Sequence, residues 1–500
     1  MEPIRPFDML LTLDGDGPRY AQITRALRTA IQDEVVAAGT RLPPTRDFAR
    51  TLGCSRNIVL LAYEQLLLEG YLSTRQGAGT FVSPELPSAK RRQRAVTPPP
   101  GPLRLSQRGR TSVTAAASAR AVMARPPGVT IDFMYGLCEP DPRVIAHVRA
   151  AFNTGLRARA FRYGPPAGDP GLRQQIADRI RAARGIARTA DDIVVTSGAQ
   201  QGLDICARLL LDPGDHVVVE DPGYVSAQAV FIAAGAKLIR VPVDEHGLDP
   251  AALPSDRVPV RALYVTPSHQ FPTGAVMPAA RRHALLAWAR RRGAYVIEDD
   301  YDGEFRYQGR PIAALAGMDT DGMVIYCGTF AKTLFPSLRL GYLAVPRGSA
   351  SVLAQGKWLC DLSSSPLLQQ TLAGLMATGE YDRHIRRMQK RYRLRRQALL
   401  DAFDKRFGAE VEIQGSAAGL HIVAWLPRLP PERVPELLAE CARRGVGMYS
   451  IAVHAAATLS QAGLLVGYGL TDPDEIKRGI ALVSEAYRAV AAPAPTRRRR

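Results

Sequence analysis

The stretch Tyr295-Val296-Ile297-Glu298-Asp299-Asp300-Tyr301 carries most of the information about the fold. A short apolar run that leads directly into carboxylates is typical of a buried strand that ends at a polar site. Similar apolar runs occupy residues 193–196, 216–220, 262–266 and 323–326, and segments of helical character separate them. Strands that alternate with helices predict a mostly parallel α/β sheet with helices on both faces.

Reactive side chains follow the last of these runs. The segment Gly328-Thr329-Phe330-Ala331-Lys332 comes directly after it, and Arg339 stands seven residues beyond the lysine. An amine can form a Schiff base with an aldehyde, a hydroxyl and a guanidinium can hold a phosphate, and a carboxylate can keep a pyridinium nitrogen protonated. Lys332, Thr329, Arg339 and Asp299 supply these groups. The combination predicts a site for pyridoxal 5'-phosphate (PLP), with Lys332 as the catalytic amine and Asp299 as the partner of the pyridinium nitrogen.

Composition excludes several classes of protein. With 500 residues, 46% of them hydrophobic and 22% charged, the chain has room for roughly two or three folded domains. It contains no apolar run of about eighteen residues and no secretory signal at its start, so we expect a cytoplasmic protein without a membrane contact. The six cysteines are scattered, which predicts buried free thiols in a reducing compartment and no metal site.

Local patterns divide the chain into parts. Helical spacing at 20–35, 45–52 and 55–70, with Ser55 as N-cap, precedes two short strands at 71–73 and 80–82, so residues 1–83 predict a helix-turn-helix domain with a β-hairpin wing. The composition then changes to Pro, Ser, Arg and Ala, which predicts a linker over 84–128. The remaining parts are expected at 129–488, divided near residue 366 into a large α/β part and a smaller α+β part (367–488), and at 489–500, a basic tail.

The distribution of charge is uneven. The net charge is +18, but residues 1–83 contain nine basic and nine acidic residues. Residues 84–128 contain nine lysines and arginines and one acidic residue, Glu85. Because phosphate contacts supply much of the affinity for DNA, we hypothesise that the basic residues at 90–94 and 104–110 add sequence-independent binding. The alternative, a linker that only separates the domains, stays open.

The N-terminal motifs resemble a known family. Residues 42–47 and 77–82 resemble the GntR-type winged helix, and nearly the whole chain resembles the MocR-type bacterial regulators, in which such a domain precedes a fold-type-I aminotransferase-like domain. Arginine can pair with guanine and asparagine with adenine, while a phosphate accepts from arginine and from wing amides. The resemblance implies DNA contacts by Arg46, Ser55, Arg56, Asn57, Arg75, Gly77, Gly79 and Thr80. Leu60 departs from the arginine that many relatives have.

The second half resembles fold-type-I aminotransferases in the order of its motifs. Phe271 stands where those enzymes have an asparagine beside the phenolic oxygen of the cofactor, so we expect Tyr301 to take this role, with Gln270 or His269 as candidate helpers. Asp300 and Asp302 are expected to be surface or helix-start charges. The cofactor-binding residues implied by the resemblance and by the local chemistry are Asp299, Tyr301, Tyr224 (stacked on the ring), Ala199, Gln200, Thr329, Arg339 and Tyr163. Tyr163 would reach the phosphate of a neighbouring subunit, which implies a homodimer with shared sites.

The resemblance implies a PLP-dependent transcriptional regulator that binds a double-stranded DNA operator and senses PLP, an amine or an amino acid. Aminotransferases of this fold hold the substrate carboxylate with an arginine of the small part, and no arginine occurs between Arg444 and Arg478. A working aminotransferase with an accessory DNA-binding domain is the alternative. A third hypothesis treats PLP as a structural brace for the dimer. Control of vitamin B6 and of amine or amino-acid catabolism both stay open.

Overall fold

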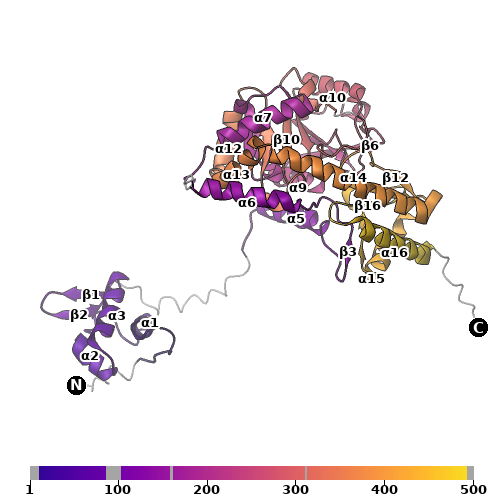
Figure 1. The fold of residues 1–500 in the computed structure, drawn as a ribbon. Coiled ribbons are helices and arrows are strands. Elements are labelled where there is room, and N and C mark those ends of the chain that lie inside the picture. Colours follow the sequence, from indigo (N-terminus) through magenta and orange to yellow (C-terminus); the bar gives the residue numbers. More distant parts are fainter. Residues whose placement is uncertain (1–10, 86–102, 158–161, 310–311, 492–500) are drawn as a thin grey trace, which may run out of the picture. The chain divides into compact units, whose positions relative to one another are not determined.

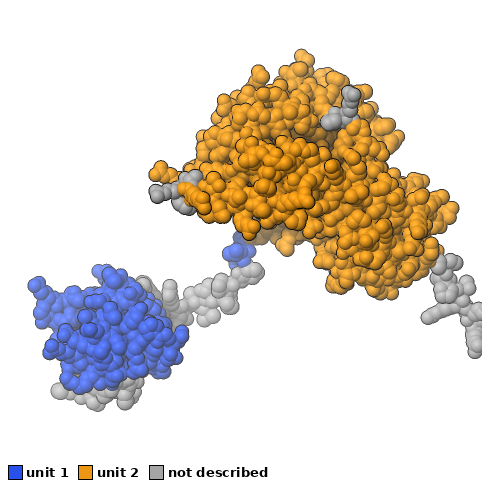
Figure 2. Space-filling view, in the orientation of Figure 1, with its two compact units in different colours: residues 1–104 blue, residues 105–500 orange. Residues whose placement is uncertain are grey.

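The computed structural model describes residues 11–85, 103–157, 162–309 and 312–491. The chain divides into two compact units, residues 1–104 and 105–500, which Figure 2 shows in different colours. Each unit is described by itself. The basic residues 90–94, proposed above to assist DNA binding, lie outside the described residues.

Unit 1 is a helix-turn-helix with a β-hairpin. Its elements are α1 (Arg19–Gln32), α2 (Thr45–Thr51), α3 (Arg56–Leu68), β1 (Leu72–Arg75) and β2 (Gly79–Val82). Ile23, Leu27 and Ile31 recur every fourth residue, so they share one face of α1 and meet Phe48 and Val59 in a small core. The hairpin is antiparallel, with Leu72 opposite Val82. The three helices and the wing expected from the sequence are confirmed.

Unit 2 contains a large α/β part and a smaller α+β part (Figure 1). The helices of the large part are α5 (Gln107–Ala121), α6 (Pro142–Arg157), α7 (Pro170–Arg184), α8 (Ala199–Leu210), α9 (Val225–Ala234), α10 (Ala279–Arg292), α11 (Leu315–Met318), α12 (Ala350–Asp361) and α13 (Pro366–Ala377). Its strands are β4 (Ile193–Thr196), β5 (His216–Asp221), β6 (Lys237–Asp244), β7 (Gly247–Leu248), β8 (Ala262–Val265), β9 (Tyr295–Asp300), β10 (Val324–Thr329) and β11 (Gly341–Ala344).

The eight strands form one sheet in the order β4-β11-β10-β9-β8-β5-β6-β7. Strands β10, β9, β8, β5 and β6 are parallel, whereas β11 runs antiparallel to both of its neighbours and β7 closes the far edge antiparallel to β6. The sequence-based expectation of a mostly parallel sheet is confirmed. Parallel strands place all their carboxyl ends at one edge of the sheet, which is where open α/β folds bind ligands.

Both faces of the sheet are buried because alternate residues of each strand point to opposite sides. Val218, Val296 and Val324 pack with apolar residues of α7, α10 and α13 in one cluster. Their neighbours Ile297 and Ile325 join a second cluster with α8, α9 and α12. This two-sided burial explains why the strands have uninterrupted apolar runs rather than an alternating pattern.

The smaller part contains α14 (Glu380–Phe407), α15 (Val434–Arg443), α16 (Pro473–Ala491) and a four-stranded antiparallel sheet in the order β12-β13-β16-β15. These strands are β12 (Glu412–Gln414), β13 (His421–Leu426), β15 (Tyr449–Ser450) and β16 (Ala462–Gly467). The early strand β3 (Ile131–Asp132) pairs in parallel with β14 (Val446–Gly447), so the smaller part also includes residues from the start of the unit. Figure 1 shows β3, in purple, among these yellow elements.

One helix lies inside the stretch that the sequence predicted as a linker. Helix α5 begins after Ser106, whose hydroxyl accepts a 3.0 Å hydrogen bond from the Gly109 amide, and it packs against α9. The buried residue of this helix, Ala119, has a small side chain. Alanine favours helix strongly but produces no apolar stripe, so the absence of apolar periodicity was a misleading signal. The compact unit accordingly begins at Leu105 rather than near residue 129.

Two expectations from composition can be compared with the structure. None of the described helices is both long and apolar enough to span a membrane. All six cysteines are free, and Cys138, Cys206, Cys327 and Cys441 are buried. Cys54 is half-buried and Cys360, on the outer side of α12, is exposed, so the expectation of six buried thiols was wrong for these two residues.

Candidate cofactor site and DNA-binding surface

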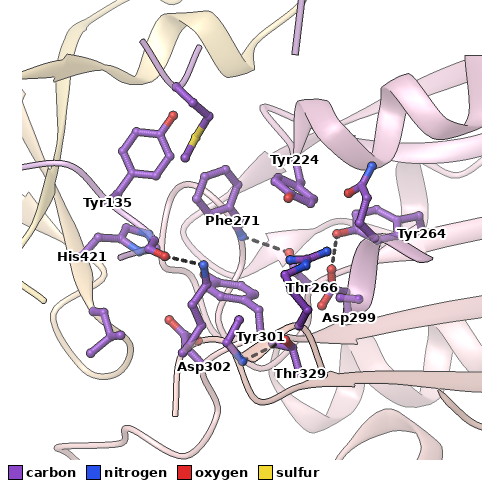
Figure 3. A pocket seen from close by; sticks show the side chains of 18 residues that line it. Tyr135, Tyr224, Tyr264, Thr266, Phe271, Asp299, Tyr301, Asp302, Thr329 and His421 are labelled. Atoms are coloured by element: carbon purple, nitrogen blue, oxygen red, sulfur yellow. Dashed lines mark hydrogen bonds between the residues drawn. The ribbon is translucent and has the colours of Figure 1, made fainter. Parts of the chain in front are cut away.

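A cavity of about 170 Å³ opens at the carboxyl ends of the central strands (Figure 3). This volume is several times the roughly 30 Å³ that one water molecule occupies, so the cavity suits a small organic ligand. Its lining brings together most of the residues that the sequence nominated: Ala199, Gln200, Tyr224, Asp299, Tyr301, Thr329, Lys332 and Arg339. It also includes Met123, Tyr135, Gly136, Tyr264, Thr266, Phe271, Ala331, Leu420, His421 and Asp302.

Asp299 lies at the end of β9 with one oxygen available. Its Oδ2 accepts a 2.8 Å hydrogen bond from the Tyr264 hydroxyl, whereas its buried Oδ1 has no hydrogen-bond partner among the described residues. Burial raises the pKa of Asp299 to about 7, the hydrogen bond from Tyr264 opposes this shift, and nearby Asp300 adds to it. A buried acceptor without a donor is costly, so an N–H group from a ligand would stabilise this carboxylate.

Lys332 lies across the cavity, in the loop after β10. Its Nζ donates a hydrogen bond to the Gly136 carbonyl. Burial lowers the pKa of Lys332 from its ordinary value, although the nearby Cys138, Asp302 and Asp299 oppose the shift. A lowered pKa increases the fraction of neutral amine, which is the form that attacks an aldehyde.

A cradle for a phosphate surrounds the start of α8. Ala199 and Gln200 are the first residues of this helix, whose first amides lack partners within the helix. Gly198 has a φ of 92°, and a Cβ at this position would lie 3.1 Å from Nη2 of Arg339. Arg339 itself adopts a φ of 51° and donates a 3.0 Å hydrogen bond to the Ser197 carbonyl. Together with Thr329 at the end of β10, these groups fit a phosphate in position, charge and space.

Aromatic side chains cover the middle of the cavity. The Tyr224 ring meets Phe271 in a T-shaped contact with centroids 5.6 Å apart. In Figure 3 both rings lie between the side chains of Asp299 and His421. An aromatic wall over a flat ring is the arrangement expected of a heteroaromatic cofactor site.

Tyr301 belongs to a buried polar chain. Its hydroxyl lies 3.0 Å from Nδ1 of His269, and the same nitrogen lies 3.0 Å from Oδ2 of Asp302. Of the two candidate helpers of Tyr301, His269 therefore contacts it. The Gln270 amide instead donates to the carbonyls of Pro222 and Phe271.

The expectation that Asp300 and Asp302 are surface charges was wrong. They are 8% and 2% exposed. Asp300 accepts from the buried guanidinium of Arg184 and from the Tyr326 hydroxyl, the latter at 2.7 Å. Asp302 is paired with His269, whose pKa is raised: burial works against this shift, but the Asp302 carboxylate outweighs it. No local sequence pattern indicates these partners, because they come from other elements.

Tyr163 lies outside the cavity. It is 82% exposed and lines a separate hollow with Gly164, Asp169 and Pro366. Its contact with the phosphate of a second subunit stays a prediction.

Several lining residues were missed by reasoning from sequence. Tyr264 stands near the end of a buried strand, as Asp299 does, so a rule that inspects polar residues at strand ends would have found it. Tyr135 and His421 belong to remote segments that only the fold brings to the cavity. No local signal marks them.

His269, Asp302 and His421 place potential metal-binding atoms within 4.8 Å of one another. These atoms already have partners within the protein. His269 Nδ1 contacts Asp302 and Tyr301, and His421 Nε2 lies 3.1 Å from the Pro272 carbonyl. Hydrogen bonding therefore accounts for this cluster.

The residues nominated for DNA contact gather at two places on unit 1. Arg46 is exposed in the first turn of α2, and Ser55, Arg56 and Asn57 are exposed at the start of α3. The Ser55 side chain makes no capping hydrogen bond, although the residue holds the N-cap position as expected. Arg56 Nε donates to Thr45 Oγ1 at 3.3 Å. These positions suit a recognition helix that presents its N-terminal end to a groove.

The wing provides the second group. Arg75 is exposed and stacks on Phe81, with its guanidinium carbon 4.8 Å from the ring centre. Gly77 and Gly79 have φ values of 73° and 113°, which the turn requires, and half-buried Thr80 follows them. Arg41, which the sequence reasoning missed, is exposed and lies beside Gly79.

Comparisons with known proteins find a family match in each of the two units. Residues 135–461 match the family described as aminotransferase class I and II, and residues 19–82 match the bacterial regulatory proteins of the gntR family. The probable rhizopine catabolism regulatory protein MocR of Rhizobium meliloti is 35% identical over 491 residues, 96% of each chain. The chain belongs to the MocR-type regulators.

Further relatives of this MocR-type regulator include the pyridoxine biosynthesis transcriptional regulator PdxR of Corynebacterium glutamicum, 33% identical over 93% of this chain and 95% of the relative. Among solved structures, the α-aminoadipate aminotransferase LysN of Thermus thermophilus superposes with a TM-score of 0.67 at 27% identity, covering 75% of this chain and 97% of that one. Kynurenine aminotransferase of Pyrococcus horikoshii gives 0.66 at 27% identity, with 78% and 95% covered. The aminotransferase fold implies PLP as the cofactor.

The carboxylate of Asp299 provides the first test. Because its pKa of about 7 lies above the ordinary 3.8, its ionisation destabilises the PLP-free fold progressively as the pH rises from about 4 through about 7. Asp299→Asn should therefore raise the melting temperature of the PLP-free protein at pH 8 by roughly 5 °C, with no gain at pH 4. It should also weaken PLP binding at least about tenfold, as measured by equilibrium dialysis. Unchanged PLP affinity would contradict the assigned role.

The DNA-binding surface provides the second test. Arg56→Ala should lower the affinity for a specific operator by roughly 1–3 kcal/mol and change the affinity for unrelated DNA much less. Arg46→Ala should lower both affinities alike and reduce the salt slope by about one. Fluorescence anisotropy over a range of salt concentrations separates the two effects. Equal losses on both DNAs for Arg56→Ala would remove that residue from base recognition.

Proposed function

We propose that this chain controls transcription in the cytoplasm according to the ligand bound in the cavity of unit 2. Unit 1 binds an operator, and unit 2 holds PLP and senses PLP itself, an amine or an amino acid. The proposal rests on Oδ1 of Asp299, which has no hydrogen-bond partner among the described residues and shares a cavity with an amine of lowered pKa. The same chain exposes the start of helix α3, which suits a recognition helix.

The roles of the lining residues follow from their chemistry. Lys332 would hold the cofactor through its amine, Asp299 would accept from the pyridinium nitrogen, and Tyr301 would donate to the phenolic oxygen. The phosphate would be held by Ala199, Gln200, Thr329 and Arg339, and Tyr224 would stack on the ring. When bound, PLP supplies an aldehyde that reacts reversibly with primary amines and a ring that withdraws electrons.

The chain would act as a homodimer. The 82% exposure of Tyr163 supports this proposal, because a tyrosine that completes the phosphate site of a second subunit must project away from its own subunit. Shared sites would make ligand binding and dimer geometry interdependent, and dimer geometry sets the spacing of two DNA half-sites. A ligand alters DNA binding only if it prefers one of two arrangements of the protein.

Anisotropy on DNA from upstream of the gene, with and without PLP at fixed salt, tests the proposal. We expect specific binding whose affinity changes at least about fivefold with PLP or with an amine added to the PLP-bound protein. In Lys332→Ala, which removes the amine, this response should be lost while the dimer persists by analytical ultracentrifugation. Equal operator binding by wild type and Lys332→Ala under every ligand condition would favour PLP as a structural brace. Absence of specific binding would oppose the regulator.

A working aminotransferase is the second candidate, supported by the aminotransferase fold and by the pairing of Lys332 with Asp299 in one cavity. Conversion of bound PLP to pyridoxamine phosphate by a panel of amino acids separates the candidates. For a sensor, we expect slow conversion that stops at a single turnover when a keto acid is supplied. Rapid multiple turnovers would establish the enzyme.

A further inference from the structure

One end of the cavity has no role in the proposed binding of the cofactor. In Figure 3, Asp299 and Tyr264 lie at the opposite end from Tyr135 and His421. Met123, Phe271 and Leu420 also line the cavity. Since the pyridine ring and phosphate are assigned to the other residues, this second end is available to an effector.

Burial disfavours a positive charge on two histidines at this end, His421 and His454. Burial holds the pKa of His421 well below its ordinary value, and neighbouring His269 lowers it further. Burial also lowers the pKa of His454, which packs behind Phe271 with ring centroids 4.9 Å apart, to about 4. Neither imidazole therefore offers a full positive charge to a ligand carboxylate.

The charge that faces the cavity from this region is negative. Asp302 is 2% exposed, and its Oδ1 has no hydrogen-bond partner among the described residues. Its other oxygen is held by His269, which is not part of the cavity lining, so the ion pair presents its carboxylate to the ligand. A second buried acceptor without a donor favours an incoming N–H group.

Cations are few in the same lining. Of the described residues that line the cavity, Lys332 and Arg339 alone are Lys or Arg. Arg339 lies against Gly198 and Ser197 in the phosphate cradle, and the Lys332 amine is needed by the cofactor. An effector carboxylate at the free end would meet rings, a methionine and Asp302. Burying a charge there without a partner is strongly unfavourable.

We propose that the effector is a primary amine that lacks a carboxylate, and that unit 2 discriminates against the corresponding amino acid. The amine is drawn toward the Asp302 carboxylate, near the Lys332 position where the cofactor would be held, and its substituent packs on Met123, Tyr135, Phe271 and Leu420. This inference rests on the proposed function and narrows its class of effector from PLP, an amine or an amino acid to an amine alone.

Matched pairs that differ only in the carboxylate test the inference. The PLP-loaded full-length protein is titrated with phenethylamine and phenylalanine, tyramine and tyrosine, and ethanolamine and serine. The absorption band of the bound cofactor and the melting temperature report binding. We expect each responding amine to reach half-saturation at a concentration at least about tenfold below that of its amino acid. An amino acid that binds as tightly as its amine, or no response to any of the three amines, would overturn the inference.

A charge added at the cavity mouth provides the complementary test. Met123 is 46% exposed, so Met123→Arg should fold, and it should improve amino-acid binding roughly fivefold relative to the amine. Val113→Arg adds the same charge on α5, where Val113 is 56% exposed and outside the lining, and should leave the preference unchanged. Equal effects of the two substitutions would contradict a local electrostatic filter.

PLP binding and DNA binding by the wild type are measured first. If the wild type binds neither PLP nor DNA, the proposed function fails. If it binds both and the amino acids act as well as the amines, the regulator stands and the amine preference fails.

Discussion

The burial of carboxylates at the C-terminal edge of the central sheet is the constraint on which the rest of unit 2 depends. Four acidic residues, Glu298, Asp299, Asp300 and Asp302, lie within five positions and are all at most 8% exposed. An ionised carboxylate in a dry interior is stable only when donors or cations surround it. The surrounding elements are therefore positioned by the need to supply those partners.

Three of these groups are compensated within the protein. Glu298 accepts 2.8 Å hydrogen bonds from the amides of Leu315 and Ala316 at the start of α11, although burial still raises its pKa to about 7. Asp300 is paired with Arg184 from α7, and Asp302 with His269 from the loop after β8. Asp299 differs, because its hydrogen-bond partner among the described residues is a neutral hydroxyl, that of Tyr264, rather than a cation or a pair of amides. The second oxygen of Asp299 is therefore available to a donor from a ligand. A carboxylate that the fold buries can thus also serve as a binding group.

Much of this site was accessible from the sequence, because its parts stand in local motifs. Asp299, Lys332, Thr329, Ala199 and Gln200 stand shortly after apolar runs, and parallel strands must bring such positions to one edge. Tyr301 was likewise correctly placed in the cavity. The burial of Asp300 and Asp302 could not be predicted. The local sequence around a carboxylate at a strand end is the same whether that carboxylate faces solvent or a buried arginine. Helix α5 was not predicted for a different reason. Its alanines favour helix formation but do not form an apolar stripe that would indicate a buried face.

The sequence by itself determined the order of domains, the two-sided burial of the parallel sheet and the chemistry available to a cofactor, since each depends on residues close together in the chain. Tertiary structure alone decided which groups line the cavity. Tyr135 precedes the large sheet, Asp302 follows β9 and His421 begins β13, so the cavity that they line joins three segments far apart in the chain. The pairing of β3 with β14 holds the segment just before Tyr135 against the smaller part. The charge of that cavity depends on side chains from distant segments. No local sequence pattern therefore predicts this charge, or the ligand that it would select.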